Sequence, residues 1–242
     1  MPYQSLDPEK LTVTVTRLHK RISERFPDSG LAAVCGELVE LAEKARDTTD
    51  VLTRPMLLLR LASGLLIALI VAGLAVTIAA LGSPQDGFTL SEFVQTLEAG
   101  INDLVLIGLA VFFLLSIERR LKRRRTLAAI SELRSIAHII DMHQLTKDPH
   151  HVLHVIVDTP TSPRRTFDGT ALARYLDYCS EALSLTGKIA ALYVQRFDDS
   201  VVLASVNEVE TLTTGLSGKI WQKLMILESG EGDMPSLPKG ST

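Results

Sequence analysis

The chain has 242 residues, of which 46% are hydrophobic and 22% are charged, and its formal net charge is −3. The hydrophobic fraction is high for a soluble chain, whereas the near-neutral charge says little about a partner. The two cysteines, Cys35 and Cys179, lie far apart in helical patterns without a CxxC context, which favours buried thiols over a disulfide or a metal role. The first residues lack the apolar core of a cleavable signal peptide.

Residues 1–54 carry two helical patterns. Asp7 and Pro8 predict the start of the first helix, because Asp is a preferred N-cap and Pro suits the first helical position. A break is predicted at Asp28, which is followed by Ser and Gly. Apolar residues recur on one side of each predicted helix: Leu11, Leu18, Ile22 and Phe26 in the first, and Leu31, Val34, Leu38 and Leu41 in the second.

The segment from Leu61 to Gly82 contains 22 residues without a charge. About 20 apolar residues cross the hydrocarbon core of a bilayer as a helix, so this segment predicts a transmembrane helix. A second uncharged segment, Leu104 to Ile117, has only 14 residues, a length that also suits a buried core helix. It is interpreted as a second span because a short link joins it to the first and a basic cluster follows it. The predicted membrane-anchoring residues are Arg119, Arg120, Lys122, Arg123, Arg124 and Arg125.

The loops predict how this transmembrane hairpin, residues 55–118, is oriented. The link 83–100 has three acidic residues and neither Lys nor Arg, whereas both flanks are basic. The positive-inside rule therefore predicts that both termini are cytoplasmic and that the acidic link is outside. The apolar pattern of Leu90 to Leu97 predicts an amphipathic helix, which either lies at the outer surface or extends the second span outward.

Residues 119–227 predict a cytoplasmic helical domain. Between residues 102 and 146 no Pro occurs and Gly108 is the only Gly, so the second span is expected to continue inward as one long helix. A connector with several prolines follows, in which Val152 to Val157 could form a short strand or an extended stretch.

A helical hairpin is predicted after this connector. Two apolar patterns follow Asp168, and Asp198-Asp199 is placed at the turn between them and as the cap of the second helix. Residues 228–242 predict a disordered tail. The predicted fold is therefore an all-α membrane protein with two transmembrane helices. Its cytoplasmic helical bundle is built from the N-terminal arm, the long inner helix and the C-terminal hairpin.

The sequence carries no signature of a known catalytic site, so we predict no enzyme activity and no cofactor. Five of the six histidines lie between His138 and His154, but their spacing matches no established zinc pattern, and no metal site is predicted. A polar network in which Arg134 and Asp141 pair across His138 is preferred, because the three residues share one helix face.

Basic side chains before and within the connector predict an anion-binding site, since Arg, Lys and His all contact phosphate. The connector also leads into a helix N-terminus, where anions are favoured. The alternative is a solvated loop without a ligand. The candidate ligand-binding residues are Arg134, His138, His143, Lys147, Arg164 and Arg165.

Three polar residues are predicted to line a pore at the outer end of the second span: Glu98, Asn102 and Asp103. In an oligomer they would form an acidic ring, and such rings favour cations. The alternative places Asp103 in the headgroup zone without a special role. Because two spans in one subunit cannot enclose a pore, the pore interpretation requires an oligomer.

The layout over Arg54 to Gln144 resembles the two-span membrane effectors of bacterial defence systems. Two closely spaced spans and a basic inner helix are similar to the SLATT group and to the channel subunit of Hailong-type nucleotide-signalling systems. In those effectors a nucleotide made during infection opens or assembles a pore. The resemblance implies a multi-pass protein of the bacterial inner membrane and a nucleotide or oligonucleotide signal as ligand.

Two functions are therefore carried forward. The first is a homo-oligomeric membrane channel or membrane-disrupting effector that is gated by its cytoplasmic domain in anti-phage defence. The second is a membrane-anchored scaffold that recruits a soluble partner protein through its C-terminal hairpin. Both use the lipid bilayer as a partner.

Overall fold

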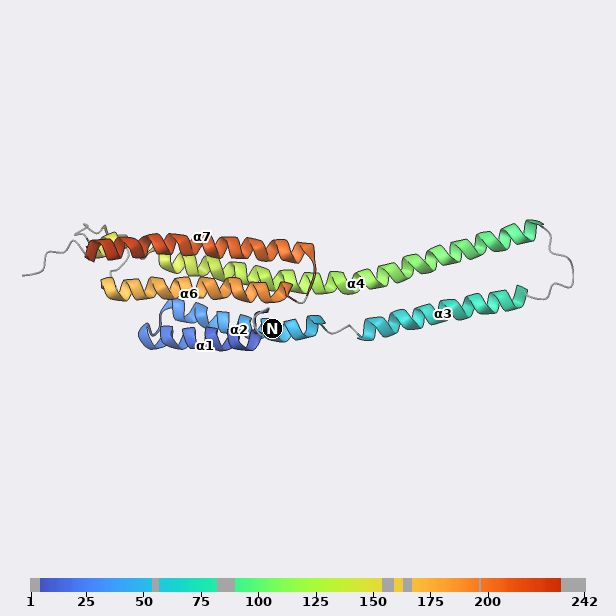
Figure 1. Cartoon of the computed structure of the whole chain (residues 1–242), viewed down its shortest axis with the longest axis horizontal. Helices are drawn as coiled ribbons and strands as arrows, with labels where there is room; N and C mark the ends of the chain where they lie inside the picture. The colour runs from blue at the N-terminus through green and yellow to red at the C-terminus, as the bar shows by residue number, and fades with distance from the viewer. Residues whose placement is uncertain are drawn as a thin grey trace, which may run out of the picture. The chain divides into compact units, whose positions relative to one another are not determined.

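The computed structural model describes residues 5–53, 57–81, 90–153, 159–162, 167–195 and 197–231. Over these residues the chain is helical and has no strand, which confirms the predicted all-α class for this part of the protein. In chain order the helices are α1 (Pro8–Arg25), α2 (Gly30–Thr53), α3 (Leu57–Leu81), α4 (Leu90–Leu145), α5 (His150–Leu153), α6 (Gly169–Val194) and α7 (Ser200–Glu231) (Figure 1).

The chain divides into two compact units, and each is described by itself. Residues 1–53 and 126–242 form the first unit, called the bundle here, and residues 54–125 form the second, called the apolar unit. The bundle contains α1, α2, the C-terminal part of α4, α5, α6 and α7. The apolar unit contains α3 and the N-terminal part of α4.

Aspartate caps fix the starts of three helices of the bundle. Asp7 accepts hydrogen bonds from backbone N–H groups in the first turn of α1 at 3.0 and 3.2 Å, and Pro8 takes the first helical position, as predicted. Asp199 accepts two such bonds at 3.1 and 3.2 Å and caps α7, as predicted. Asp168 caps α6 with one bond of 2.7 Å. Between α1 and α2, Asp28 adopts a φ of 59°, which suits a tight helix break.

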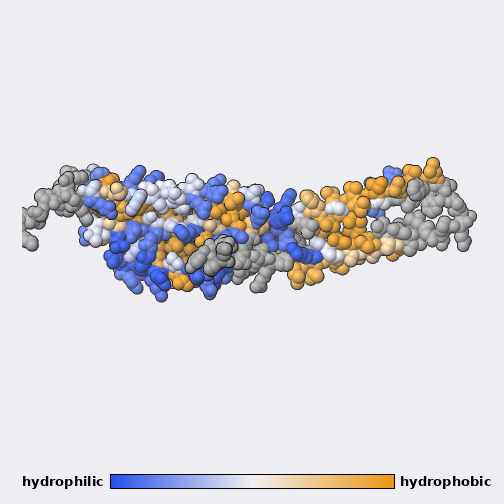
Figure 2. Space-filling model, in the orientation of Figure 1, coloured by the Kyte–Doolittle hydropathy of each residue, from blue (hydrophilic) through white to orange (hydrophobic). Residues whose placement is uncertain are grey.

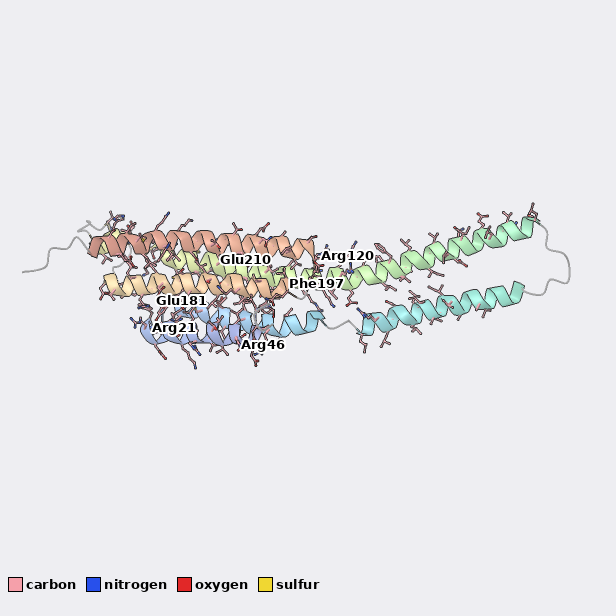
Figure 3. The ribbon with its side chains drawn as sticks, viewed as in Figure 1. Arg21, Arg46, Arg120, Glu181, Phe197 and Glu210 are labelled. Carbon is pink, nitrogen blue, oxygen red and sulfur yellow. The ribbon has the colours of Figure 1, made fainter. Side chains whose placement is uncertain are left out.

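Helix α6 lies at the centre of the bundle, where it packs against α1, α2 and α7. One continuous core joins these helices with α4, and α6 contributes fully buried residues along its length, including Leu176, Leu183 and Ile189. The predicted apolar sides of α1 and α2 face this core, except that Leu41 is only partly buried. At the α6–α7 turn, Phe197 packs partly buried against the same core (Figure 3).

Helix α4 crosses from one unit into the other without a break, as predicted for the long inner helix. It begins at Leu90, so the predicted amphipathic segment continues the helix instead of forming a separate surface helix. Within the apolar unit its large apolar side chains are exposed, Leu104, Leu109 and Phe112 each by more than 60%. Beyond residue 126 only one side is apolar, and that side is buried in the core of the bundle.

Among the described residues, α4 alone is long and apolar enough to cross a membrane by length and composition. An 18-residue window in Gly100–Leu145 has a mean hydropathy of 2.2 and none of it is buried. Within the described part of α3, the apolar helix found by the same criterion is shorter, Arg60–Gly73. The two-span arrangement therefore stays a prediction. Figure 2 shows apolar side chains gathered over α3 and this part of α4.

Several predicted segments lie wholly or partly outside the described residues. Residues 83–89 of the acidic link and residues 154–157 of the predicted strand or extended stretch belong to this group. The start of that stretch belongs to the short helix α5. Helix α7 continues to Glu231, so the first residues of the predicted tail are helical, and residues 232–242 are not described.

Replacing Leu183 by Ala should lower the free energy of unfolding of the bundle by about 2–5 kcal/mol, because it leaves a cavity at a fully buried position of the central helix. Leu203→Ala is the matched control, since Leu203 is 49% exposed on α7 and its truncation should cost less than about 0.5 kcal/mol. Denaturant unfolding of the purified protein, followed by circular dichroism, measures both. Equal effects of the two substitutions would contradict the packing described.

Candidate functional site

The six predicted ligand-binding residues do not form one cluster. Arg134 forms an ion pair with Glu208 of α7, and His138 is exposed on α4. The predicted pair of Arg134 and Asp141 across His138 is wrong, because Asp141 instead accepts a hydrogen bond of 2.6 Å from the side chain of Gln144. His143 and Lys147 line one cavity of the bundle. Arg164 and Arg165 lie outside the described residues.

The cavity that contains His143 and Lys147 has a volume of about 390 Å³. Three parts of the bundle meet there: the α1–α2 turn, the C-terminal end of α4 and the start of α6. Its lining combines polar side chains with apolar and aromatic ones. Its lining residues are Ser29, Gly30, Ile139, Met142, His143, Thr146, Lys147, Phe167 and Tyr175.

Lys147 supplies a positive charge at the aromatic side of this cavity. Its Nζ lies 4.5 Å from the ring centroid of Phe167 and 5.5 Å from that of Tyr175, which is the geometry of cation–π contacts. Burial lowers the pKa of Lys147 from its usual value, because the ammonium has lost part of its hydration. A lysine ammonium beside a cavity is a suitable partner for an anion.

The aromatic wall is built from residues that are far apart in the sequence. Phe26, at the end of α1, lies edge-on to Phe167 and Tyr175, with ring centroids 5.2 and 5.3 Å apart. Phe167 and Tyr175 are themselves 5.1 Å apart. Because such pairs stabilise one another through ring edges and faces, the wall is a fixed part of the bundle. Sequence reasoning missed it, since nothing in the local patterns brings these three rings together.

His143 lies directly against the start of α2. A Cβ on Gly30 would overlap Cε1 of the His143 ring and would lie 2.8 Å from both ring nitrogens, so only glycine allows this approach. Ser29 accepts a hydrogen bond of 3.2 Å from the N–H of Ala32 and so begins α2 at the cavity. The first N–H groups of a helix carry partial positive charge, so this end of the cavity favours an anion.

Lys223 of α7 holds the main chain at the end of α4. Its Nζ donates hydrogen bonds to the backbone carbonyls of Gln144 at 2.7 Å and Lys147 at 3.0 Å. Burial lowers the pKa of Lys223, and the nearby carboxylates of Asp148 and Asp141 oppose that shift. A lysine at this place is favourable because helix C-termini leave carbonyls without partners within the helix. The main chain of Lys147 is thereby tied to α7.

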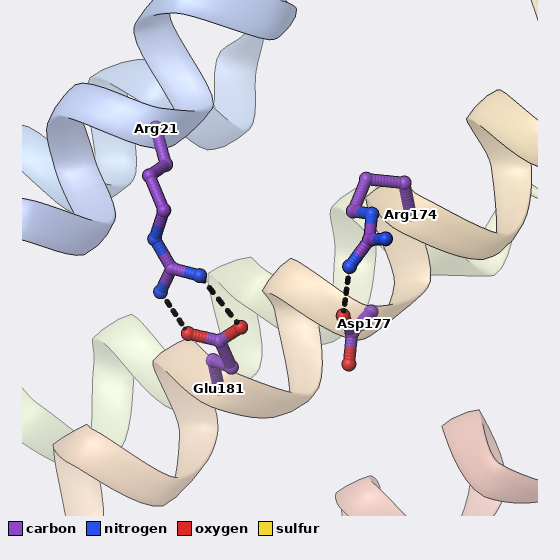
Figure 4. Close-up of polar contacts among 4 residues, drawn as sticks. All are labelled: Arg21, Arg174, Asp177 and Glu181. Carbon is purple, nitrogen blue, oxygen red and sulfur yellow. Dashed lines mark hydrogen bonds and ion pairs between the residues drawn. The ribbon is translucent and has the colours of Figure 1, made fainter.

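Ion pairs at the surface of the bundle connect its helices. Arg21 of α1 makes a two-pronged pair with Glu181 of α6, which raises the pKa of Arg21 chiefly through the hydrogen bond (Figures 3 and 4). Lys44 of α2 pairs with Glu132 of α4 at 2.7 Å. These side chains are between one third and two thirds exposed, so each pair contributes roughly 0–1 kcal/mol and serves mainly to orient the helices.

In the apolar unit, the three predicted pore-lining residues, Glu98, Asn102 and Asp103, are exposed side chains of α4. The predicted anchoring residues differ among themselves: Lys122 pairs with Glu118 at 3.0 Å and Arg123 is partly exposed, whereas Arg119, Arg120, Arg124 and Arg125 are exposed. Figure 3 labels Arg120 on α4.

Sequence reasoning missed Glu118 as the ion-pair partner of the basic residues at this end of the apolar unit. Glu118 is only 9% exposed, pairs with Lys122 within α4 and reaches Arg60 of α3 at 3.7 Å. It therefore links α3 to α4 at the basic end of the apolar segment. Its position directly before the basic cluster was the available signal, because an acidic residue four positions before Lys122 favours a helical ion pair.

No group of three or more His, Cys, Asp or Glu side chains within the described ranges is arranged to hold a metal ion. Comparison of the chain with protein-family models, with curated proteins and with solved structures finds no match.

Cys35 and Cys179 should resist alkylation in the folded protein. Both thiols are buried, and burial raises the pKa of Cys35 to about 12, so about one thiol in ten thousand is ionised at pH 8. Mass spectrometry after iodoacetamide treatment should find neither residue modified in native protein and both modified after unfolding. Rapid labelling of the native protein would show that α2 and α6 do not pack as described.

Proposed function

We propose that this protein is a homo-oligomeric membrane channel or membrane-disrupting effector, gated by a ligand that binds the bundle. One observation carries the proposal: α4 is a single helix that holds both the apolar segment and the last turn beside the cavity. The exposed pore-lining candidates and His143 therefore belong to the same helix. A ligand that contacts the end of α4 acts on the element proposed to surround the pore.

The membrane placement is supported by the composition of α4. Its 56 residues measure about 84 Å as a helix, which is far longer than the roughly 30 Å hydrocarbon core of a bilayer. Apolar side chains exposed on all sides suit lipid and neighbouring subunits, and the basic cluster suits the cytoplasmic interface. The proposal therefore places two spans, α3 and α4, in a bacterial inner membrane with both termini in the cytoplasm.

The gating step requires a ligand that distinguishes two states of the protein, because a ligand with equal affinity for both shifts nothing. The cavity is a suitable receptor, since it lies where α2, α4 and α6 meet and its Lys147 is tied to α7 through Lys223. A nucleotide-type signal in anti-phage defence, as the resemblance implies, would supply the anion. The cation selectivity of the pore would come from Glu98 and Asp103.

Replacing Asp103 by Asn should lower the single-channel conductance of the protein several-fold and reduce its preference for cations, because an exposed ring of carboxylates would be removed. Glu228→Gln is the matched control, since Glu228 is an exposed acid on α7 in the other unit. Planar bilayers that contain the purified full chain provide the measurement. Wild-type protein that never conducts ions, or an effect of Asp103→Asn no larger than that of the control, would refute the pore.

Two exposed side chains favour the scaffold as a second candidate. Trp221 and Met225 lie one turn apart on α7 and are 64% and 57% exposed. Large exposed apolar residues of this kind often mark protein contacts.

If the protein is a scaffold, Trp221→Ala together with Met225→Ala should abolish binding of a soluble partner while conductance stays unchanged. Conductance lost in the double variant, with partner binding kept, would exclude the scaffold.

A further inference from the structure

We propose that the cavity binds a small phosphomonoester, with its single anionic group at Lys147 and His143 and a flat, apolar body against Ile139 and Met142. This inference rests on the proposed function in taking the cavity as the ligand site. It adds the chemical class and size of the ligand. The argument uses the charge, the lining and the volume of the cavity.

The position of Lys147 indicates where the anionic group of the ligand would bind. The ammonium of Lys147 lies over two aromatic rings, and the attraction of a ring for a cation is weaker than that of a hydrogen-bonded phosphate. A long, flexible lysine side chain can turn from the rings to a phosphate without movement of the main chain. Its carbonyl stays held by Lys223.

The second contact to the anion comes from the α2 side of the cavity. Gly30 lets the His143 ring lie against the start of α2, so the imidazole and the first turn of α2 border the same space. Thr146 and Ser29 add hydroxyl groups to the lining. A phosphate has several acceptor oxygens and can accept hydrogen bonds from several of these donors at once.

The apolar residues of the lining indicate that the rest of the ligand is flat and apolar. Ile139, Met142 and Phe167 supply apolar groups to the lining, and Met142 is 65% exposed, so its flexible side chain can close over a ring. Inorganic phosphate would leave these apolar groups uncovered. A ligand with an aromatic or other flat apolar body should therefore bind more tightly than phosphate alone.

The volume of the cavity indicates the size of the ligand. Cavities for drug-sized ligands range from roughly 300 to 1,000 Å³, and about 390 Å³ lies near the lower limit. This space accommodates one ring and one phosphoryl group. A volume of this size favours a mononucleotide-sized ligand over an oligonucleotide.

The test is isothermal titration calorimetry on the full chain in nanodiscs with phenyl phosphate as the probe. Lys147→Met should weaken binding at least tenfold, because it removes the charge and keeps the length of the side chain. Gly30→Ala should weaken it similarly, since the new methyl group pushes the His143 ring into the cavity. Inorganic phosphate should bind more weakly than phenyl phosphate, and phenol should not bind measurably.

Two control variants separate these effects from general damage. Gly36→Ala is another glycine substitution in α2, but its Cβ would meet His19 at an ordinary 3.5 Å, so binding should be unchanged. Lys188→Met removes an exposed lysine of α6 whose Nζ contacts Ser184, and binding should again be unchanged. Thermal unfolding of every variant shows whether the bundle is intact.

Several results would overturn the inference. These are no binding of phenyl phosphate to the wild-type protein, equal affinity for phosphate and phenyl phosphate, or equal losses in the Lys147 and Lys188 variants. Tighter binding of a 5′-phosphorylated adenylate trinucleotide than of AMP would assign the cavity to an oligonucleotide. Binding with the predicted variant pattern but without a change in conductance would support the site and refute the gating role.

Discussion

The structure depends on the burial of one side of α4 in the core of the bundle. From residue 126 onward its apolar side chains, such as Leu133, Ala137 and Ile140, are almost fully buried. Between Leu104 and Phe113 the same helix is apolar on all sides and largely exposed. Exposing this apolar part of the helix to water is unfavourable, and contact with lipid or with another protein surface removes that cost.

The bundle gives the end of α4 a defined environment. Glu132 and Arg134 form ion pairs with α2 and α7, and Lys223 bonds to the carbonyls at the helix end. The individual ion pairs are weak, whereas the shared core is strong. A small ligand beside His143 and Lys147 therefore contacts a helix end that is packed and hydrogen-bonded on several sides, which is a suitable place for a signal to enter.

Local patterns in the sequence were sufficient for most of the helices. The caps at Asp7 and Asp199, the uninterrupted course of α4 and the apolar sides of α1, α2, α6 and α7 all follow from short-range chemistry. The cavity could be predicted only in part. His143 and Lys147 were named from their charge, but the aromatic wall of Phe26, Phe167 and Tyr175 depends on tertiary packing. The same limit explains Arg134, whose partner Glu208 is 74 residues away along the chain and replaces the nearby Asp141.

The most direct test of the account is electron cryo-microscopy of the full chain in nanodiscs without added ligand. The account predicts a closed ring of subunits with the apolar segment of α4 around the axis and Asp103 facing it. A monomer, or a dimer with no path along an axis, would contradict the channel and would leave α4 as a membrane tether.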